Sequence, residues 1–213
     1  MTTPYETEVK FYAPDLAVIQ QRLEDAGAIC TAPRILERNV RYENETHSLT
    51  EKGIVLRLRQ DSRVRLTYKE SGEVKGDLSH RPEWELEVSD FETMEMILSK
   101  LGFSSYMVYE KYRTTYTWQD TEIVLDELPY GPFVEIEGEE DDIRAAIKTF
   151  GLEGYTAQAT SYVKLFDRVK RMLGLNFYNL TFKNFEGIDV PARVFTEYTD
   201  DDQDRNSDIE DDA

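Results

Sequence analysis

Hydrophobic and polar residues alternate along most of this chain. A period of two puts successive side chains on opposite faces of a β-strand. The alternation predicts eight strands, near residues 5–12, 35–44, 53–60, 63–70, 83–89, 107–118, 121–128 and 132–138. Most of the segments between them are short and rich in turn-forming residues, so a largely antiparallel sheet is expected.

Apolar residues at a spacing of three and four predict four helices. They cover residues 14–27, 91–101, 140–150 and 161–173, and each ends at or next to a glycine, as many helices do. Strands and helices together predict an α+β fold. Residues 174–196 contain five aromatic side chains. This stretch is too aromatic for a plain linker, and we expect it to pack on the domain or on a partner.

The polar faces of the predicted strands carry charges in like-signed sets. Glu6 and Glu8 precede Lys10 on one face of the first strand, and Arg57 and Arg59 share a face of the third. A solvated outer sheet face explains any one such strand. Over eight strands, adjacent like charges favour a closed barrel whose charged faces point inward and whose apolar faces lie under the helices.

The interior of such a barrel would be a polar tunnel with acidic and basic walls. The acidic candidates are Glu6, Glu8, Asp126, Glu135 and Glu137, and the basic candidates are Lys10, Arg57, Arg59, Lys69, Lys111 and Arg113. Clustered carboxylates repel one another unless a cation neutralises them, and oxygen-only ligands favour Mg²⁺ or Mn²⁺. The basic side chains would hold phosphate oxygens. The pattern therefore predicts a metal with a polyphosphate.

Composition limits the class of protein. The 213 residues suit one domain, and the net charge of −18 argues against general affinity for nucleic acid. No apolar run is long enough to span a membrane. The first residues lack a secretory signal, and Cys30 is the only cysteine, which fits a reducing cytoplasm. We expect Cys30 to be a small buried residue.

The end of the chain differs in composition from the rest. Residues 197–213 hold nine acidic residues and one basic residue, Arg205, so this tail is expected to be disordered. The chain is therefore divided into a domain over 1–173, an aromatic extension over 174–196 and an acidic tail over 197–213. The extension and the tail are candidates for self-association as a homodimer or for covering a mouth of the tunnel.

Seven segments in order resemble the CYTH superfamily, which includes class IV adenylate cyclases, thiamine triphosphatases and other triphosphate tunnel metalloenzymes. Glu6-Thr7-Glu8-Val9-Lys10 resembles its ExExK signature. The other matching segments are 56–59, 67–69, 81–87, 110–113, 126–137 and 161–165. The resemblance covers about residues 4–173.

The resemblance implies an eight-stranded antiparallel tunnel. It implies metal on Glu6, Glu8, Asp126, Glu135 and Glu137, with triphosphate against Lys10, Arg57, Arg59, Lys69 and Arg113. Lys164 would approach the triphosphate from the C-terminal helix. Lys111 belongs to the matching segment 110–113 and is a further candidate for binding it. Lys75, His80 and Arg81 fall in a segment that could close over substrate or be a solvated loop.

Three functions fit these residues. The first is metal-dependent hydrolysis of tripolyphosphate, ATP or thiamine triphosphate, with Glu8 or Glu137 as proton acceptor and Lys164 near the reacting phosphate. The second is a class IV adenylate cyclase that converts ATP to cyclic AMP and pyrophosphate. The third is a non-catalytic module that binds polyphosphate or nucleotide. Hydrolysis ranks first because it requires no base pocket, and the sequence reveals none.

Overall fold

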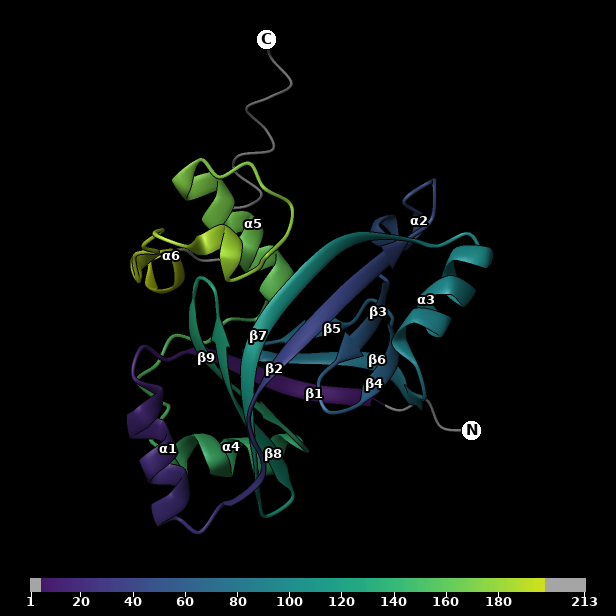
Figure 1. Ribbon diagram of the computed structural model, residues 1–213. Coiled ribbons are helices and arrows are strands. Elements are labelled where there is room, and N and C mark those ends of the chain that lie inside the picture. The colour runs from purple at the N-terminus through teal and green to yellow at the C-terminus, as the bar shows by residue number, and fades with distance from the viewer. Residues whose placement is uncertain (1–4, 198–213) are drawn as a thin grey trace.

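The computed structural model describes residues 5–197 and contains a closed barrel of eight antiparallel strands (Figure 1). Around the barrel the strands follow the order β1, β9, β8, β7, β2, β3, β4, β6, and β1 pairs with β6 to close it. Their bounds are β1 Tyr5–Tyr12, β2 Ile29–Glu43, β3 Val55–Gln60, β4 Val64–Lys69, β6 Leu78–Val88, β7 Ser104–Trp118, β8 Thr121–Leu128 and β9 Gly131–Glu137. The ninth strand, β5 (Glu73–Lys75), pairs with β6 outside the ring.

Helices cover the outside and one end of this barrel. They are α1 Leu16–Asp25, α2 Ser48–Glu51, α3 Phe91–Lys100, α4 Glu140–Thr149, α5 Tyr162–Leu173 and α6 Arg193–Thr196, with a 3₁₀ turn at Lys183–Phe185. Among residues 5–197 no helix has the length and apolar character needed to cross a membrane.

The apolar faces of the strands point outward into three clusters of buried side chains. The first contains Val9 and Phe11 of β1 and packs beneath α1 and α4. A second lies against α5 and includes Phe166, and a third lies against α3 and includes Leu98. Burial of these outer faces leaves the opposite, charged faces to line the interior. The inward placement of the charges predicted by the strand pattern is therefore confirmed.

Residues 174–196 pack against the barrel. The backbone N–H of Leu180 donates to the carbonyl of Val108 in β7, and the side chain of Leu180 is fully buried. Phe185 and Phe195 join the cluster beneath α5. This part of the chain is therefore continuous with the core. Except for Glu197, the acidic tail expected over 197–213 lies outside the described residues.

Several local expectations from the sequence were wrong. Cys30 is exposed in β2 and not buried, because both faces of this end of the strand are open to solvent: its neighbours Ile29 and Thr31 are exposed as well. Lys75 lies in β5, and His80 and Arg81 lie in β6, so the expected closing segment is paired strand.

Candidate functional site

A cavity of about 470 Å³ lies in the barrel and opens beside α5. Ten of the residues expected in the site line it: Glu6, Glu8, Lys10, Arg57, Arg59, Lys69, Lys111, Arg113, Glu135 and Lys164. Asp126 and Glu137 do not line it. A smaller cavity of about 250 Å³ shares Glu8, Lys10, Arg81 and Lys164 with the first.

The register of β1 against β9 builds one wall of the cavity. Glu8 lies directly opposite Glu137, and Lys10 lies directly opposite Glu135. Opposed residues of antiparallel strands share a face, so the charges of both strands meet on the inner side. Lys10 Nζ lies 2.6 Å from Glu135 and 3.6 Å from Glu8. Burial alone would lower the pKa of Lys10, but Glu135 and Glu8 outweigh it and raise that pKa.

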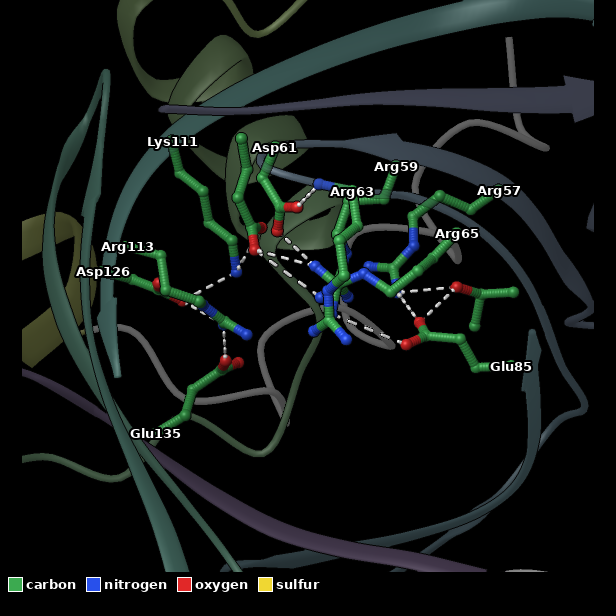
Figure 2. A network of polar contacts seen from close by, with 12 residues as sticks. Arg57, Arg59, Asp61, Arg63, Arg65, Glu85, Lys111, Arg113, Asp126 and Glu135 are labelled. Atoms are coloured by element: carbon green, nitrogen blue, oxygen red, sulfur yellow. Dashed lines mark hydrogen bonds and ion pairs between the residues drawn. The ribbon is translucent and has the colours of Figure 1, made fainter. Parts of the chain in front are cut away.

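Asp126 on β8 is held by basic side chains from β7. Arg113 donates to both of its carboxylate oxygens, and Lys111 Nζ lies 2.9 Å from Oδ2. Arg113 also contacts Glu135, so it joins β8 to β9 (Figure 2). Asp126 is fully buried behind these cations. In this arrangement its charge orients Lys111 and Arg113.

The opposite wall comes from β3 and β4. Arg57 Nη1 donates to the Tyr109 hydroxyl at 2.9 Å, and Arg57 Nη2 donates to Thr67 Oγ1 at 3.1 Å. The Arg57 guanidinium also lies 3.7 Å from Glu85. Arg59, next along the same face, lies 3.5 Å from Glu37. These partners hold two guanidinium groups side by side in the tunnel, as Figure 2 shows.

Lys69 connects the basic wall to the first strand. Its Nζ lies 2.6 Å from Glu6 and also contacts Glu83 of β6. Burial and Glu83 raise the pKa of Glu6, which Lys69 alone would lower. Glu83 and Glu85 thus pair with tunnel cations, whereas Glu87 pairs with the exposed Arg63.

Helix α5 brings two further groups to the cavity. The Ser161 hydroxyl accepts the backbone N–H of Lys164 and caps the first turn. This start places Tyr162 over the cavity, where its ring lies 4.5 Å from Lys10 Nζ and 5.2 Å from Lys111 Nζ. Lys164 lines both cavities.

The carboxylates at the edge of β1 and β9 fit a hard divalent cation in their chemistry. Glu137 lies opposite Glu8 on one side and opposite Glu122 of β8 on the other. Burial, with the nearby charges of Glu6 and Glu122, raises the pKa of Glu137 to about 8. In the part of the chain that the structure describes, no three acidic, histidine or cysteine side chains converge as they would around a bound ion. Glu6 and Glu135 are instead paired with lysines.

Sequence reasoning missed several residues of the site. Glu37 is 1% exposed and lies 3.6 Å from Lys111 Nζ. It precedes Asn39 and Arg41 on the same face of β2, so the period of two, continued by one step, would have found it. Arg41 and Tyr109 line the cavity as well. Arg81, expected from the sequence in a segment that could close over substrate, also lines it and donates to the carbonyls of Glu70 and Gly53.

Comparisons with known proteins agree with this architecture. A protein of Pyrococcus horikoshii superposes with a TM-score of 0.63 at 24% identity, over 75% of this chain and 98% of that one. An adenylate cyclase candidate of Vibrio parahaemolyticus gives 0.64 at 16% identity, over 82% and 100%. A Hippeastrum adenylyl cyclase candidate, reported with a dominant triphosphatase activity, gives 0.57 at 17% identity, over 81% and 97%. At these identities the likeness shows the fold.

No curated protein matches the chain. The family model of the CYTH domain matches residues 4–156, which include every strand of the barrel and the first four helices. With this match and the closed tunnel of charged strands, the chain belongs to the CYTH domain family.

Proposed function

We propose that the protein hydrolyses a triphosphate inside the tunnel with the help of Mg²⁺ or Mn²⁺. The observation that carries the proposal is a cavity into which eight basic side chains and the carboxylates of β1 converge from different strands. Lysine and arginine side chains that line the tunnel match a chain of phosphate oxygens. The negative net charge of the protein does not prevent phosphate binding, because binding depends on the local electric field of the basic side chains in the tunnel.

The basic residues would contact the phosphates in two groups. Lys10, Lys111 and Arg113 lie near β9 and α5, and Arg57 and Arg59 lie on β3. Lys69 lies at the edge near Glu6. Such preorganised cations stabilise negative charge that builds up on the transferred phosphoryl group and the leaving group. Lys164, on α5, would contact the same phosphates from the open side.

Glu6, Glu8 and Glu137 would hold the divalent cation at the edge of β1 and β9. The cation supplies charge neutralisation on the phosphate oxygens and a more acidic bound water. Asp126 and Glu135, the other ligands expected from the sequence, are bound to Lys111, Arg113 and Lys10 here. Glu135 lines the cavity and could turn to the same cation, whereas Asp126 lies behind the cations.

Ion-pair exchange would connect phosphate binding to cation binding. Lys69 neutralises Glu6, and Lys10 neutralises Glu135. When a phosphate oxygen takes over Lys69 or Lys10, the released carboxylate becomes available as a ligand. The buried cations then exchange one anionic partner for another and are not left unpaired, which avoids a large desolvation cost.

The nucleophile in this proposal is water. The smaller cavity adjoins the first at Glu8 and Lys10, so water can reach Glu8 from a second side. Glu8 or Glu137 would accept the proton of the attacking water. The water oxygen would bond to the terminal phosphorus as the bond from that phosphorus to its bridging oxygen breaks. Orthophosphate forms in this step, and the diphosphate leaves with the bridging oxygen.

A second candidate keeps the fold and changes the nucleophile. In an adenylate cyclase the ribose 3′-hydroxyl attacks the α-phosphate, and pyrophosphate leaves. Tyr106 and Tyr178 in the lining of the cavity favour this candidate, because they offer a place for a base.

Product analysis distinguishes the candidates. The protein would be incubated with Mg²⁺ or Mn²⁺ and, separately, tripolyphosphate, ATP and thiamine triphosphate. Orthophosphate with a diphosphate product supports hydrolysis. Cyclic AMP with pyrophosphate from ATP would replace the hydrolase proposal with the cyclase. Binding of all three without turnover under either metal would favour a non-catalytic polyphosphate or nucleotide module.

A further inference from the structure

The large cavity has apolar and aromatic lining residues, which have no role in binding phosphate oxygens. Beyond the charged walls it is lined by Ile54, Val55, Tyr106, Met107, Val163 and Tyr178. These residues come from the start of β3, the start of β7, helix α5 and the segment after α5. Its total volume of about 470 Å³ lies in the range of pockets that bind whole organic ligands.

Tyr178 is exposed although the backbone on both sides of it is fixed. Its side chain is 80% exposed, whereas Leu180 is fully buried. On the other side, Phe177 stacks on Phe166, with ring centroids 5.8 Å apart. The Asn179 side chain accepts the backbone N–H of Val108. The segment is therefore held on β7, and an aromatic ring is presented at the cavity at little cost in backbone order.

Tyr106 supplies a second ring at the same cavity. It lies near the start of β7 and is about one-third exposed, and the Arg41 guanidinium lies 5.4 Å from its ring centroid. Burial raises the pKa of its hydroxyl, so the ring is neutral at physiological pH. Aromatic side chains beside basic ones are a common arrangement for binding bases together with phosphates.

We propose that Tyr106 and Tyr178 bind the head group of an organic triphosphate, and that this head group is an uncharged nucleobase. The assignment rests on the proposed function, because the phosphates must lie in the tunnel for the head group to reach these rings. Tyr178 belongs to the segment after α5, beyond the residues matched by the family model. This segment thus contributes a specificity-determining residue.

The charges around the two rings favour a neutral head group. Arg41 lies beside Tyr106, and Lys164, Asp167 and Lys170 of α5 line the same cavity. Asp167 is already paired with Lys170 at 2.8 Å. The remaining charge is positive, so it repels a cationic ring such as the thiazolium of thiamine. A neutral base keeps the stacking without that repulsion.

The test compares kcat/KM for ATP, tripolyphosphate and thiamine triphosphate in the intact protein and three variants. In Tyr178→Ala we expect kcat/KM for ATP to fall roughly tenfold or more, the usual effect of losing one stacking ring, and tripolyphosphate turnover to stay within about twofold. Tyr178→Phe keeps the ring and is expected to keep ATP turnover. Trp84→Ala removes an exposed aromatic side chain on β6 that lines neither cavity and serves as the control.

Several results would overturn the proposal. An equal loss for ATP and tripolyphosphate would mean that Tyr178 acts on the tunnel and not on a head group. Unchanged ATP turnover in Tyr178→Ala, or a Tyr178-dependent preference for thiamine triphosphate, would also reject the nucleobase. If no substrate is turned over, the proposed function fails separately. Calorimetric binding of ATP against tripolyphosphate to the same variants then decides the head-group assignment, which fails if Tyr178→Ala binds both as the wild type does.

Discussion

The hydroxyl of Tyr162 donates a hydrogen bond of 2.9 Å to the carboxylate of Asp126. Tyr162 is the first residue of α5 and Asp126 lies on β8, so this bond connects a helix outside the sheet to the charged interior. The same carboxylate holds Lys111 and Arg113. Through Asp126, the position of α5 is coupled to the geometry of two phosphate-binding candidates.

Tyr162→Phe is expected to weaken both stability and turnover. It keeps the ring beside Lys10 and Lys111 but removes a buried hydrogen bond to a charged group, worth roughly 1.5–3 kcal/mol. Urea denaturation should show that loss, and kcat/KM should fall because Lys111 and Arg113 lose part of their support. Tyr68→Phe on the outer face of β4 is the control. Unchanged stability and kinetics in Tyr162→Phe would contradict the coupling.

Arg57→Ala is expected to reduce kcat/KM by roughly 100-fold or more, because a preorganised cation at a transferring phosphate contributes on that order. Arg57→Lys should restore only part of the activity, since an ammonium cannot reproduce the two-pronged contact. Arg34→Ala removes an exposed guanidinium that pairs with Glu127 outside the cavity, and its kinetics should match the wild type. Wild-type activity in Arg57→Ala would remove Arg57 from the site.

Glu137→Gln should raise the concentration of Mg²⁺ or Mn²⁺ needed for half-maximal activity by roughly tenfold or more and lower the maximal rate. The fold should not be weakened, because the change relieves repulsion with Glu8 and Glu122 across the sheet. Titration of activity with each metal, together with a melting curve, measures both effects. Glu92→Gln, on α3, is the matched control. Full activity at an unchanged metal concentration would exclude Glu137 as a ligand.

Glu37 should make stability depend on acid pH. Burial raises the pKa of Glu37, but Lys111 and Arg59 outweigh it and hold that pKa well below its ordinary value of 4.5. A depressed carboxyl pKa contributes stability above pH 4.5, and this contribution is lost as pH falls below 4.5. Glu37→Gln should therefore lose roughly 3–5 kcal/mol of unfolding free energy at pH 7, because it leaves the buried Arg59 without its ion-pair partner. The unfolding free energy of the variant should change less below pH 4.5.

Added tripolyphosphate provides the control for Glu37→Gln. Its phosphates can pair with the cations that the variant leaves without Glu37, so it should stabilise the variant more than the wild type. Urea denaturation at pH 7 and pH 3.5, with and without tripolyphosphate, measures all of these effects. If the unfolding free energy of the variant depends on pH as that of the wild type does, Glu37 is not the cause of the pH dependence.

Leu180→Ala tests whether the segment after α5 is part of the folded unit. Leu180 is fully buried and bridges to Tyr109 of β7, so the truncation should cost roughly 2–5 kcal/mol of unfolding free energy. It should also loosen Tyr178 and lower ATP turnover more than tripolyphosphate turnover. Leu101→Ala, at an exposed position after α3, should be nearly neutral. A neutral Leu180→Ala would mean that the segment only rests on the barrel.

Much of the barrel was predictable because a period of two fixes the face of a residue without knowledge of its neighbours. The alternation in β1 placed Val9 and Glu8 on opposite faces, and the like-signed charges of all eight strands predicted that Glu8 faces inward. Strand limits were less predictable where the ladder is irregular. β2 begins at Ile29 and not near residue 35, because register shifts after Cys30 and Ala32 break the alternation. Glu37 was missed although it lies within the predicted strand over 35–44, on the same face as Asn39 and Arg41.

The sequence by itself determined which residues carry charge, which face of a strand they share and which family they resemble. Only the tertiary structure decided their partners, because the pairing register of distant strands places Lys10 against Glu135 and Arg113 against Asp126. A slip of one residue would reverse every face. The aromatic section of the large cavity could not be predicted from the sequence either. Tyr106 and Tyr178 line one cavity only because the segment beyond α5 folds back along β7. Periodicity describes a strand, whereas a site forms from contacts between strands and helices far apart in the chain.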